Sequence, residues 1–286
     1  MSVDGTIKLF RYGENQWVTA DDVRKALRDV NAADCKVLFL HTELNFGVKN
    51  PEIKRKELCD ILFQLIMELG VETVVFPTFT FSYGNKEDFD VRTTPTKMGM
   101  FNEYVRKLPE AKRSVDPMMS VVVFGKEKGL LNITGEKSLG EGSIFDNLHK
   151  AEGVRFLFFG TSLGMCGTHM HYVEEKLRVP YRYDMDFYGH VTDYDGNTKD
   201  DHRILYVKYR DILPAVPPSF EQMLIDKKLM PEVSLGANKV YSITEVDMYR
   251  ELVAALEKDV NAFLAEPYAT HPFVKDYHYG NVTTVQ

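Results

Sequence analysis

Residues 156–175 decide the fold, and they read FLFFGTSLGMCGTHMHYVEE. The four consecutive apolar residues from Phe156 to Phe159 predict a buried β-strand. Gly160 begins a glycine-rich turn, and Thr168 opens a segment with helical spacing. The stretch therefore predicts a strand, a tight turn and the start of a helix.

Three polar residues of the predicted helix, Thr168, His171 and Glu174, recur at intervals of three. Residues at this spacing share one helical face, here next to the loop that leaves a strand end. An unperturbed imidazole has a pKa of about 6.5 and can hold a proton briefly at neutral pH. We therefore interpret His171 as a candidate general base that Glu174 could orient. The alternatives are that His171 is a structural histidine bonded to a carbonyl and that Glu174 is a solvated charge on the helix.

The size and composition of the chain predict one soluble domain. Its 286 residues are 44% hydrophobic, enough to bury a full α/β core. No linker-like run divides residues 1–286, so we expect a single domain. The apolar runs are shorter than the roughly 18 residues that span a bilayer, and the N-terminus lacks a signal-peptide pattern. We expect a cytoplasmic protein that has no membrane partner.

Cysteine usage and charge exclude further classes of protein. Cys35, Cys59 and Cys166 are an odd number without paired spacing, which predicts reduced thiols rather than disulfides or a zinc site. A formal net charge of −7 argues against nucleic acid as the main partner. This charge is compatible with a cationic substrate, although many soluble enzymes are equally acidic.

Helices and strands alternate in the first part of the chain. We predict a helix over 20–30 with an N-cap at Thr19, a strand over 37–40, a helix from Pro51 to Gly70, and a strand over 73–76. This order predicts a parallel core with functional loops at the carboxyl ends of its strands. His41 and Thr78 both follow such ends.

The later segments are less regular. Residues 83–100 predict a long loop of the kind that often binds substrate. A third strand is predicted over 120–124, and residues 140–143 precede a short helix through Leu148, where backbone N–H groups could face an anion. A strand over 204–209 and a last helix from Thr244 through Phe263 follow, and the segment after Pro267 has no pattern that we interpret.

Two other kinds of chemistry remain open at the central stretch. His169 and His171 form a His-x-His pair, which on a strand would place two metal ligands on one face, whereas on a helix the two rings diverge. Cys166 could act as a nucleophile with a neighbouring histidine as its base, although a cysteine beside glycine more often only packs. A metal-dependent hydrolase and a non-catalytic sugar-binding protein are thus the rival functions.

With these residues in hand, the sequence resembles the aminoglycoside 3-N-acetyltransferase family over residues 20–265. Each motif alone is weak, and their order carries the resemblance: His41-Thr42-x-Leu44-x-x-Gly47, Phe76-Pro77-Thr78-Phe79-Thr80, Arg113-Ser114-x-Asp116-Pro117-x-x-Ser120 followed by Gly140-x-Gly142-Ser143, and Thr168-x-x-His171-x-x-Glu174. The resemblance implies a layered α/β sandwich around a largely parallel or mixed central sheet. This fold is unrelated to that of the common GNAT acetyltransferases.

The resemblance also implies N-acyl transfer from acetyl-CoA or a longer acyl-CoA, without a metal. In that chemistry His171 is the general base, Glu174 fixes its tautomer, and Thr168 or a backbone N–H near it stabilises the oxyanion. Residues at the strand ends and at the later glycine turn would bind the coenzyme: His41, Thr42, Leu44, Gly47, Thr78, Ser120 and Ser143.

Two departures from the family pattern concern the acceptor. The family usually has His-Pro where this chain has Asp116-Pro117, and Glu43 replaces a small hydroxyl residue. Some family members acylate nucleotide-linked amino sugars for surface polysaccharides. We therefore expect such an acceptor, for example a dTDP-linked 3-amino-3,6-dideoxyhexose.

The candidate acceptor-binding residues are Tyr83, Asp88, Arg92 and Asp116. Phe89 and Lys97 in the long loop are a further aromatic group and a further basic group of the kinds that a nucleotide needs. The alternative acceptor is an aminoglycoside, for which carboxylates are available at Asp88, Asp90, Glu174 and Glu175. Both partners of the enzyme would then be small molecules, and a homo-oligomer is compatible with the sequence.

Overall fold

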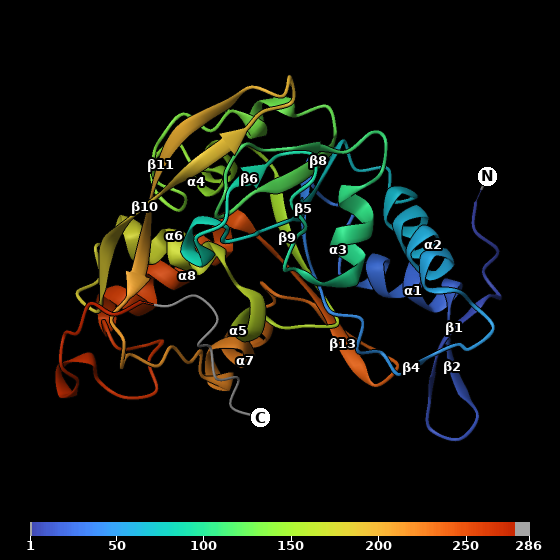
Figure 1. Cartoon of the computed structure of the whole chain (residues 1–286). Helices are drawn as coiled ribbons and strands as arrows, with labels where there is room; N and C mark the ends of the chain where they lie inside the picture. The colour runs from blue at the N-terminus through green and yellow to red at the C-terminus, as the bar shows by residue number, and fades with distance from the viewer. Residues whose placement is uncertain (1, 278–286) are drawn as a thin grey trace.

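A seven-stranded sheet forms the centre of the computed structural model, which describes residues 2–277 (Figure 1). The strand order is β12-β13-β9-β3-β5-β8-β7. β3 (Val37–Thr42) pairs in parallel with β5 (Thr73–Pro77) and β9 (Val154–Phe159), whereas β8 (Val121–Gly125) and β13 (Asn238–Thr244) flank them antiparallel. The sheet is therefore mixed and parallel only at its centre. The edge strands are β7 (Lys112–Arg113) and β12 (Glu232–Leu235).

Helices cover both faces of this sheet because its central strands are apolar on both sides. Phe39 and Phe156 pack with α4 (Ile144–Lys150), α6 (His169–Lys176) and α8 (Glu245–Lys258). Leu38 and Leu157 pack on the opposite face with α1 (Ala20–Asp29), α2 (Arg55–Met67) and α3 (Gly99–Arg106). Figure 1 shows these two helical layers on either side of the strands. The short α5 (Leu163–Cys166) contacts α7 (Pro218–Asp226).

Several predicted elements agree with the structure to within a few residues. Thr19 accepts a hydrogen bond from the backbone N–H of Asp22, and the Asp22 carboxylate accepts one from Thr19 N, so the N-cap of α1 is confirmed as a capping box. Thr244 caps α8 through Asp247 N. However, α8 ends at Lys258 rather than near Phe263.

Two antiparallel units were missed because short strands carry a weak sequence signal. One is the sheet of β1 (Lys8–Tyr12), β2 (Gln16–Thr19) and β4 (Val48–Lys49) beside α1. The other is the β12–β13 pair, which extends the central sheet beyond β9. Neither alternates clearly enough between apolar and polar residues to be found from periodicity.

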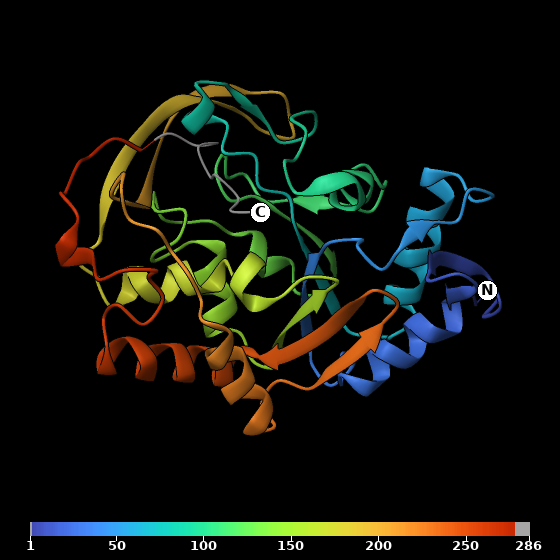
Figure 2. The same cartoon turned by 90° about the horizontal axis from the view of Figure 1, so that it is seen from below.

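A long hairpin of β10 (Arg182–Thr192) and β11 (Thr198–Lys208) forms a second sheet, and its inward residues, such as Phe187 and Leu205, join the core that also holds α6. The predicted strand over 204–209 is the end of β11 and belongs to this separate sheet. Figure 2 shows the hairpin curving around the side of the molecule that carries α6. At the hairpin tip β6 (Phe89–Asp90) pairs in parallel with Val191 and Thr192, so the predicted loop 83–100 is partly ordered. Its other regular part is η1 (Tyr83–Asn85), and η2 (Lys128–Leu131) and η3 (Tyr268–Thr270) are the remaining 3-10 turns among residues 2–277.

The three cysteines are free thiols, as predicted. Within residues 2–277, no helix has the length and apolar character needed to cross a membrane.

Candidate active site

The turn after β9 brings α6 to the carboxyl end of the central strands. Gly160 has a φ of +77°, and a Cβ at this position would lie 1.9 Å from the carbonyl oxygen of Glu43 in the loop after β3. Only glycine fits both the conformation and the close approach. The chain then forms α5 and enters α6, with Thr168 at the N-cap position.

His171 and Glu174 form a hydrogen-bonded pair on one face of α6. His171 Nδ1 lies 2.7 Å from Glu174 Oε2. The His171 side chain is 32% exposed whereas that of Glu174 is 1% exposed. The predicted pair is thus brought together with the imidazole open to an incoming molecule and the carboxylate behind it.

Arg182 is a third member of this cluster that our sequence analysis did not find. Its Nε lies 2.8 Å from Glu174 Oε2, and its Nη2 lies 2.9 Å from His171 Nδ1. Arg182 is the first residue of β10, a strand that was not predicted, and no motif marks it. Only the path of the hairpin places it against α6.

The surroundings favour a neutral imidazole beside an ionised carboxylate. Burial and the charge of Arg182 lower the pKa of His171, and these effects outweigh the opposing contact with Glu174. Burial alone would raise the pKa of Glu174, but Arg182 and the hydrogen bond from His171 lower it. Because an ionised carboxylate only accepts hydrogen bonds, we assign the proton to Nδ1 of His171, which leaves the Nε2 lone pair free.

Thr168 is linked to His171 through the backbone alone. The N–H of His171 donates to Thr168 O at 3.0 Å. The N–H and hydroxyl of Thr168 both donate to the carbonyl of Cys166, at 2.7 and 3.3 Å. Its role as an oxyanion donor stays a prediction and would require these bonds to rearrange.

His169 faces the core rather than His171. It is fully buried against Phe156, and its Nε2 lies 2.9 Å from Glu245 Oε1, which also contacts His149. The two rings of the His-x-His pair therefore have different partners, as expected on a helix. Among residues 2–277, no three His, Cys, Asp or Glu side chains cluster in a way that could hold a metal ion.

Cys166 lies among groups that favour its neutral thiol. Burial raises its pKa, and this effect outweighs the hydrogen bond that the Thr161 hydroxyl donates to Sγ at 3.2 Å, which acts to lower it. A nucleophilic cysteine needs its pKa lowered by a neighbouring base or cation. These surroundings give no support to the nucleophile hypothesis.

The end of β3 and the turn after it hold four of the predicted coenzyme-binding residues. His41 is buried and stacks on Phe158 with ring centroids 5.3 Å apart. The Thr42 hydroxyl donates to Asn102 Oδ1 at 3.1 Å. Leu44 is half-buried, and at Gly47, where φ is +141°, a Cβ would meet Arg11 O at 2.4 Å. Thr42 and Leu44 are thus the two of these side chains that keep part of their surface open.

The other three predicted coenzyme-binding residues have structural partners. Thr78 and Ser120 are buried, and their hydroxyls meet Arg113 Nε at 3.3 and 3.1 Å. Ser143 is buried and caps α4 by accepting from Asp146 N. Their contact with a coenzyme stays a prediction, and these bonds argue for roles in holding the strand ends and α4.

The predicted acceptor-binding residues of the long loop gather far along the hairpin. Tyr83 donates to Asp201 Oδ2 at 3.2 Å, Asp88 accepts from His190 N at 3.0 Å, and Arg92 donates to Tyr194 O at 3.3 Å. From Arg182 to this region the strand covers roughly 30 Å, at about 3.3 Å per residue. The structure does not place these three side chains beside His171.

Asp116, the fourth predicted acceptor residue, is fully buried in the turn before β8. Its Oδ1 accepts from the N–H groups of Met118 and Met119 at 2.8 and 2.9 Å, and from the Ser138 hydroxyl at 3.1 Å. Burial raises its pKa. These bonds give the carboxyl a role in shaping the turn.

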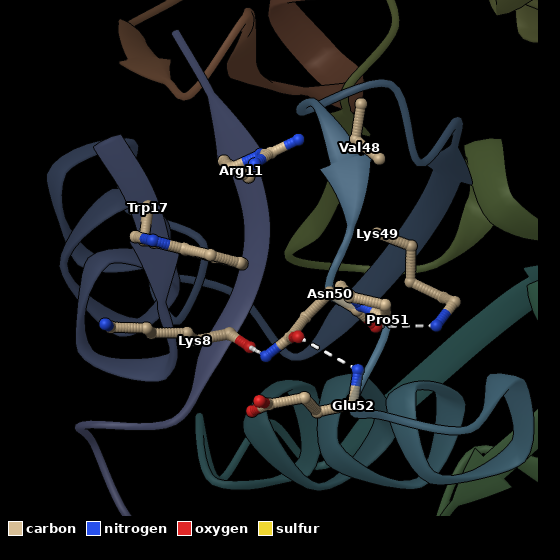
Figure 3. Close-up of a pocket in the computed structure, with 8 residues that line it drawn as sticks. All are labelled: Lys8, Arg11, Trp17, Val48, Lys49, Asn50, Pro51 and Glu52. Atoms are coloured by element: carbon tan, nitrogen blue, oxygen red, sulfur yellow. Dashed lines mark hydrogen bonds between the residues drawn. The ribbon is translucent and has the colours of Figure 1, made fainter. Parts of the chain in front are cut away.

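A hollow of about 350 Å³ lies elsewhere, between β1, β4 and the loop after β4 (Figure 3). Trp17, Lys8 and Arg11 line one side of it, and Glu52 is also among the lining residues. Lys49 in its wall donates to Asn50 O at 2.6 Å. None of the predicted site residues lines this hollow.

His171 is partly exposed and hydrogen-bonded to Glu174 at the carboxyl edge of an α/β sheet, a geometry that suits general-base catalysis in a group-transfer enzyme. Residues 39–257 match the model of the family described as aminoglycoside 3-N-acetyltransferase, and the chain belongs to this family. It is therefore an N-acyltransferase that takes its acyl group from a coenzyme A thioester. Comparison with curated protein sequences gives no match.

Solved structures of low sequence identity share the fold. The YokD protein from Bacillus subtilis is 18% identical with a TM-score of 0.68, and the match covers 85% of this chain and 95% of that one. The aminoglycoside acetyltransferase AAC(3)-Xa is 16% identical with a TM-score of 0.69, covering 84% and 93%. AAC-IIIb in its binary form with CoASH is 16% identical with a TM-score of 0.67, covering 87% and 98%.

Proposed function

We propose that this enzyme transfers an acyl group from acyl-CoA to the primary amine of a nucleotide-linked amino sugar, with His171 as the general base. The observation that carries the base assignment is the contact of 2.7 Å between His171 Nδ1 and Glu174 Oε2, on an imidazole that is one-third exposed. A positioned base of this kind contributes roughly 10² to 10⁴ in rate.

The residues of α6 would move one proton through the reaction. The acceptor amine arrives largely as ammonium and first releases one proton to solvent. The nitrogen of the neutral amine must then lose a second proton as it bonds to the thioester carbon. Nε2 of His171 accepts that proton while Nδ1–H donates to Glu174, which stabilises the imidazolium. When the C–S bond breaks, the imidazolium returns the proton to the departing thiolate, and the products are an amide and a free thiol.

The charges around His171 favour an anionic acceptor. Arg182 lies against the base, and Lys208, near Arg182 on β11, donates to Ile212 O at 2.8 Å. Lys275 lies 5.1 Å from the ring of Tyr183 on the same hairpin. Because Arg182 is buried against Glu174, Lys208 and Lys275 would contact the diphosphate, and the aromatic rings would contact the base. A compound with several ammonium groups would suit these cations less well.

The alternative acceptor is an aminoglycoside, as the family name suggests, and related solved structures hold sisomicin or a gentamicin. Such a polycation needs free carboxylates near the base. Glu174 is engaged by Arg182, and Glu175 is buried with Lys137 Nζ at 2.8 Å. These pairings weigh against the alternative.

A free-thiol assay tests the proposal. Acetyl-CoA and longer acyl-CoAs are offered with dTDP-, UDP- and GDP-linked amino sugars and with kanamycin- and gentamicin-type compounds. We expect the highest kcat/KM with a nucleotide-linked amino sugar, such as a dTDP-linked 3-amino-3,6-dideoxyhexose. Better values with the aminoglycosides would establish the alternative. Release of thiol that depends on a metal would instead revive the hydrolase hypothesis.

A further inference from the structure

Arg182 makes more contacts in the site than the proposed mechanism uses. Besides Glu174 and His171, its Nη1 donates to Tyr206 O at 3.2 Å, so β11 also holds the guanidinium in place. The side chain is 6% exposed. A guanidinium this buried is too enclosed to serve mainly as a surface contact for substrate.

The two partners of His171 compete for one nitrogen. Glu174 Oε2 and Arg182 Nη2 both lie within hydrogen-bond distance of Nδ1, at 2.7 and 2.9 Å. The carboxylate can only accept and the guanidinium can only donate, so Nδ1 cannot satisfy both. With the proton on Nδ1, the imidazole donates to Glu174 and its Nε2 can act as the base. With a lone pair on Nδ1, the imidazole accepts from Arg182, the proton lies on Nε2, and Nε2 cannot act as the base.

The charge balance decides the resting state. Glu174 is a buried carboxylate that needs one cation nearby. Arg182 supplies that cation permanently. Because the charge of Glu174 is then already balanced, a second positive charge on His171 is unfavourable. Without Arg182, protonation of His171 would supply the missing charge, and the imidazole would rest as imidazolium.

We propose that Arg182 is a positioning residue that keeps Glu174 ionised and His171 neutral in the free enzyme, so that Nε2 is ready to accept the amine proton. This inference rests on the proposed function of His171. Arg182 also makes the imidazolium short-lived, which favours return of the proton to the leaving thiolate. The charged and titratable groups around His171 and Arg182 are Glu174 on α6, Tyr181 just before β10, Tyr206 and Lys208 on β11, and Tyr277 of the C-terminal segment.

The test compares Arg182→Gln and Arg182→Lys with Arg178→Gln. Arg178 is the matched control because it is a half-exposed arginine that lies just after α6 and pairs with Asp184 rather than with Glu174. Two quantities are measured for each protein: the pH dependence of kcat/KM, and the protonation of His171 by ¹⁵N NMR of its imidazole. Thermal unfolding reports whether each variant folds.

In Arg182→Gln we expect the acidic limb of kcat/KM to move to higher pH by about 1 to 3 units, the usual effect of a charge at this distance. Activity near pH 7 would then fall, by at most about tenfold for each pH unit that the limb moves, and would recover at higher pH. In Arg182→Lys the acidic limb should lie at a pH between those of the parent and of Arg182→Gln. The positive charge remains, but the guanidinium that reaches both Glu174 and His171 is lost. Arg178→Gln should leave the limb in place.

A uniform loss of activity at every pH, with an unmoved limb and an unchanged NMR titration of His171, would show that Arg182 only anchors the hairpin and would overturn the inference. If Arg182→Gln does not fold, Arg182→Lys decides the question by the same two measurements. The NMR titration needs no turnover, so it separates this inference from the base assignment. A full activity in His171→Ala, together with a shifted His171 titration in Arg182→Gln, would refute the base while leaving the electrostatic coupling established.

Discussion

Tyr181 donates its hydroxyl to Oε1 of Glu174 at 2.8 Å, on the carboxylate oxygen that His171 does not use. Glu174 is therefore bonded through both oxygens, to a phenol on one side and to the imidazole and guanidinium on the other. The phenol precedes β10 directly, so the start of the hairpin fixes the carboxylate of α6 in two ways. The proposed base is thus hydrogen-bonded to a carboxylate that residues of both a helix and a hairpin hold in place.

Tyr181→Phe removes this hydroxyl while it keeps the ring in the core. One buried hydrogen bond to a charged group is worth about 1.5 to 3 kcal/mol, so we expect kcat to fall about tenfold as the carboxylate becomes free to rotate. The folded protein should keep its hairpin contacts. Steady-state kinetics decide the matter, and an unchanged kcat would mean that Arg182 alone holds Glu174.

His171→Ala and His169→Ala should separate chemistry from stability. We expect His171→Ala to fold normally and to lose acyl transfer by roughly 10² to 10⁴. His169→Ala should instead unfold at lower temperature, because it removes a buried ring from Phe156 and leaves Glu245 with one partner fewer, a cost of about 1 to 3 kcal/mol. Activity of His171→Ala within threefold of the parent would refute the base assignment.

The core of the fold was predictable because its signals are local. Val37–Leu40, Thr73–Phe76 and Phe156–Phe159 are short apolar runs between caps and glycines, and all three form the parallel centre of the sheet. The hairpin was not predictable in the same way. Its β10 arm alternates inward residues such as Tyr183 and Phe187 with exposed residues such as Asp184, a strand pattern that our sequence analysis missed. Its position, however, depends on packing against α6 and the C-terminal segment.

For the site, sequence spacing predicted the pair His171 and Glu174 because both lie on one helix. Arg182 could not be found in this way, since its contact with α6 arises from tertiary structure. The loop residues Tyr83, Asp88 and Arg92 do not lie beside this pair, and their role in acceptor binding stays a prediction. Their chemistry suited an acceptor, but β6 ties the loop to the far end of the hairpin.

Acid should destabilise the protein through His41. Burial, with a contribution from nearby His169, lowers the pKa of His41 to about 3, whereas an unfolded histidine has a pKa of about 6.5. Below that value the unfolded chain binds a proton that the folded chain does not. Stability is therefore complete above about pH 6.5 and is lost as the pH falls toward 3, by up to about 1.4 kcal/mol per unit for this residue.

Denaturant unfolding at a series of pH values measures this loss. His41→Phe keeps an aromatic ring on Phe158 but cannot titrate, so its stability should fall less steeply between pH 6.5 and 4. A slope identical to that of the parent would assign the acid sensitivity to other groups, such as His169.

Thr42 and Ser143 should respond differently when their hydroxyls are removed. Thr42 is half-buried beside the turn after β3, so Thr42→Val should raise the KM for acyl-CoA several-fold and leave kcat nearly unchanged, the signature of lost uniform binding. Ser143→Ala removes the cap of α4 and should lower stability by about 1 kcal/mol. A fall in kcat for Thr42→Val with an unchanged KM would contradict a coenzyme contact at this turn.

Lys208 tests the charge of the acceptor. It lies on β11 near Arg182, where burial and that guanidinium lower its pKa. If the acceptor carries a diphosphate, Lys208→Gln should raise the KM for a nucleotide-linked amino sugar about fivefold, roughly the worth of one charge-assisted contact, and added salt should reduce the difference. Lys199→Gln is the matched control because Lys199 is exposed at the tip of the same strand, away from His171. Steady-state kinetics at two ionic strengths give the answer: an equal change in both variants, or a lower KM for the nucleotide-linked acceptor in Lys208→Gln, would contradict an anionic acceptor beside the base.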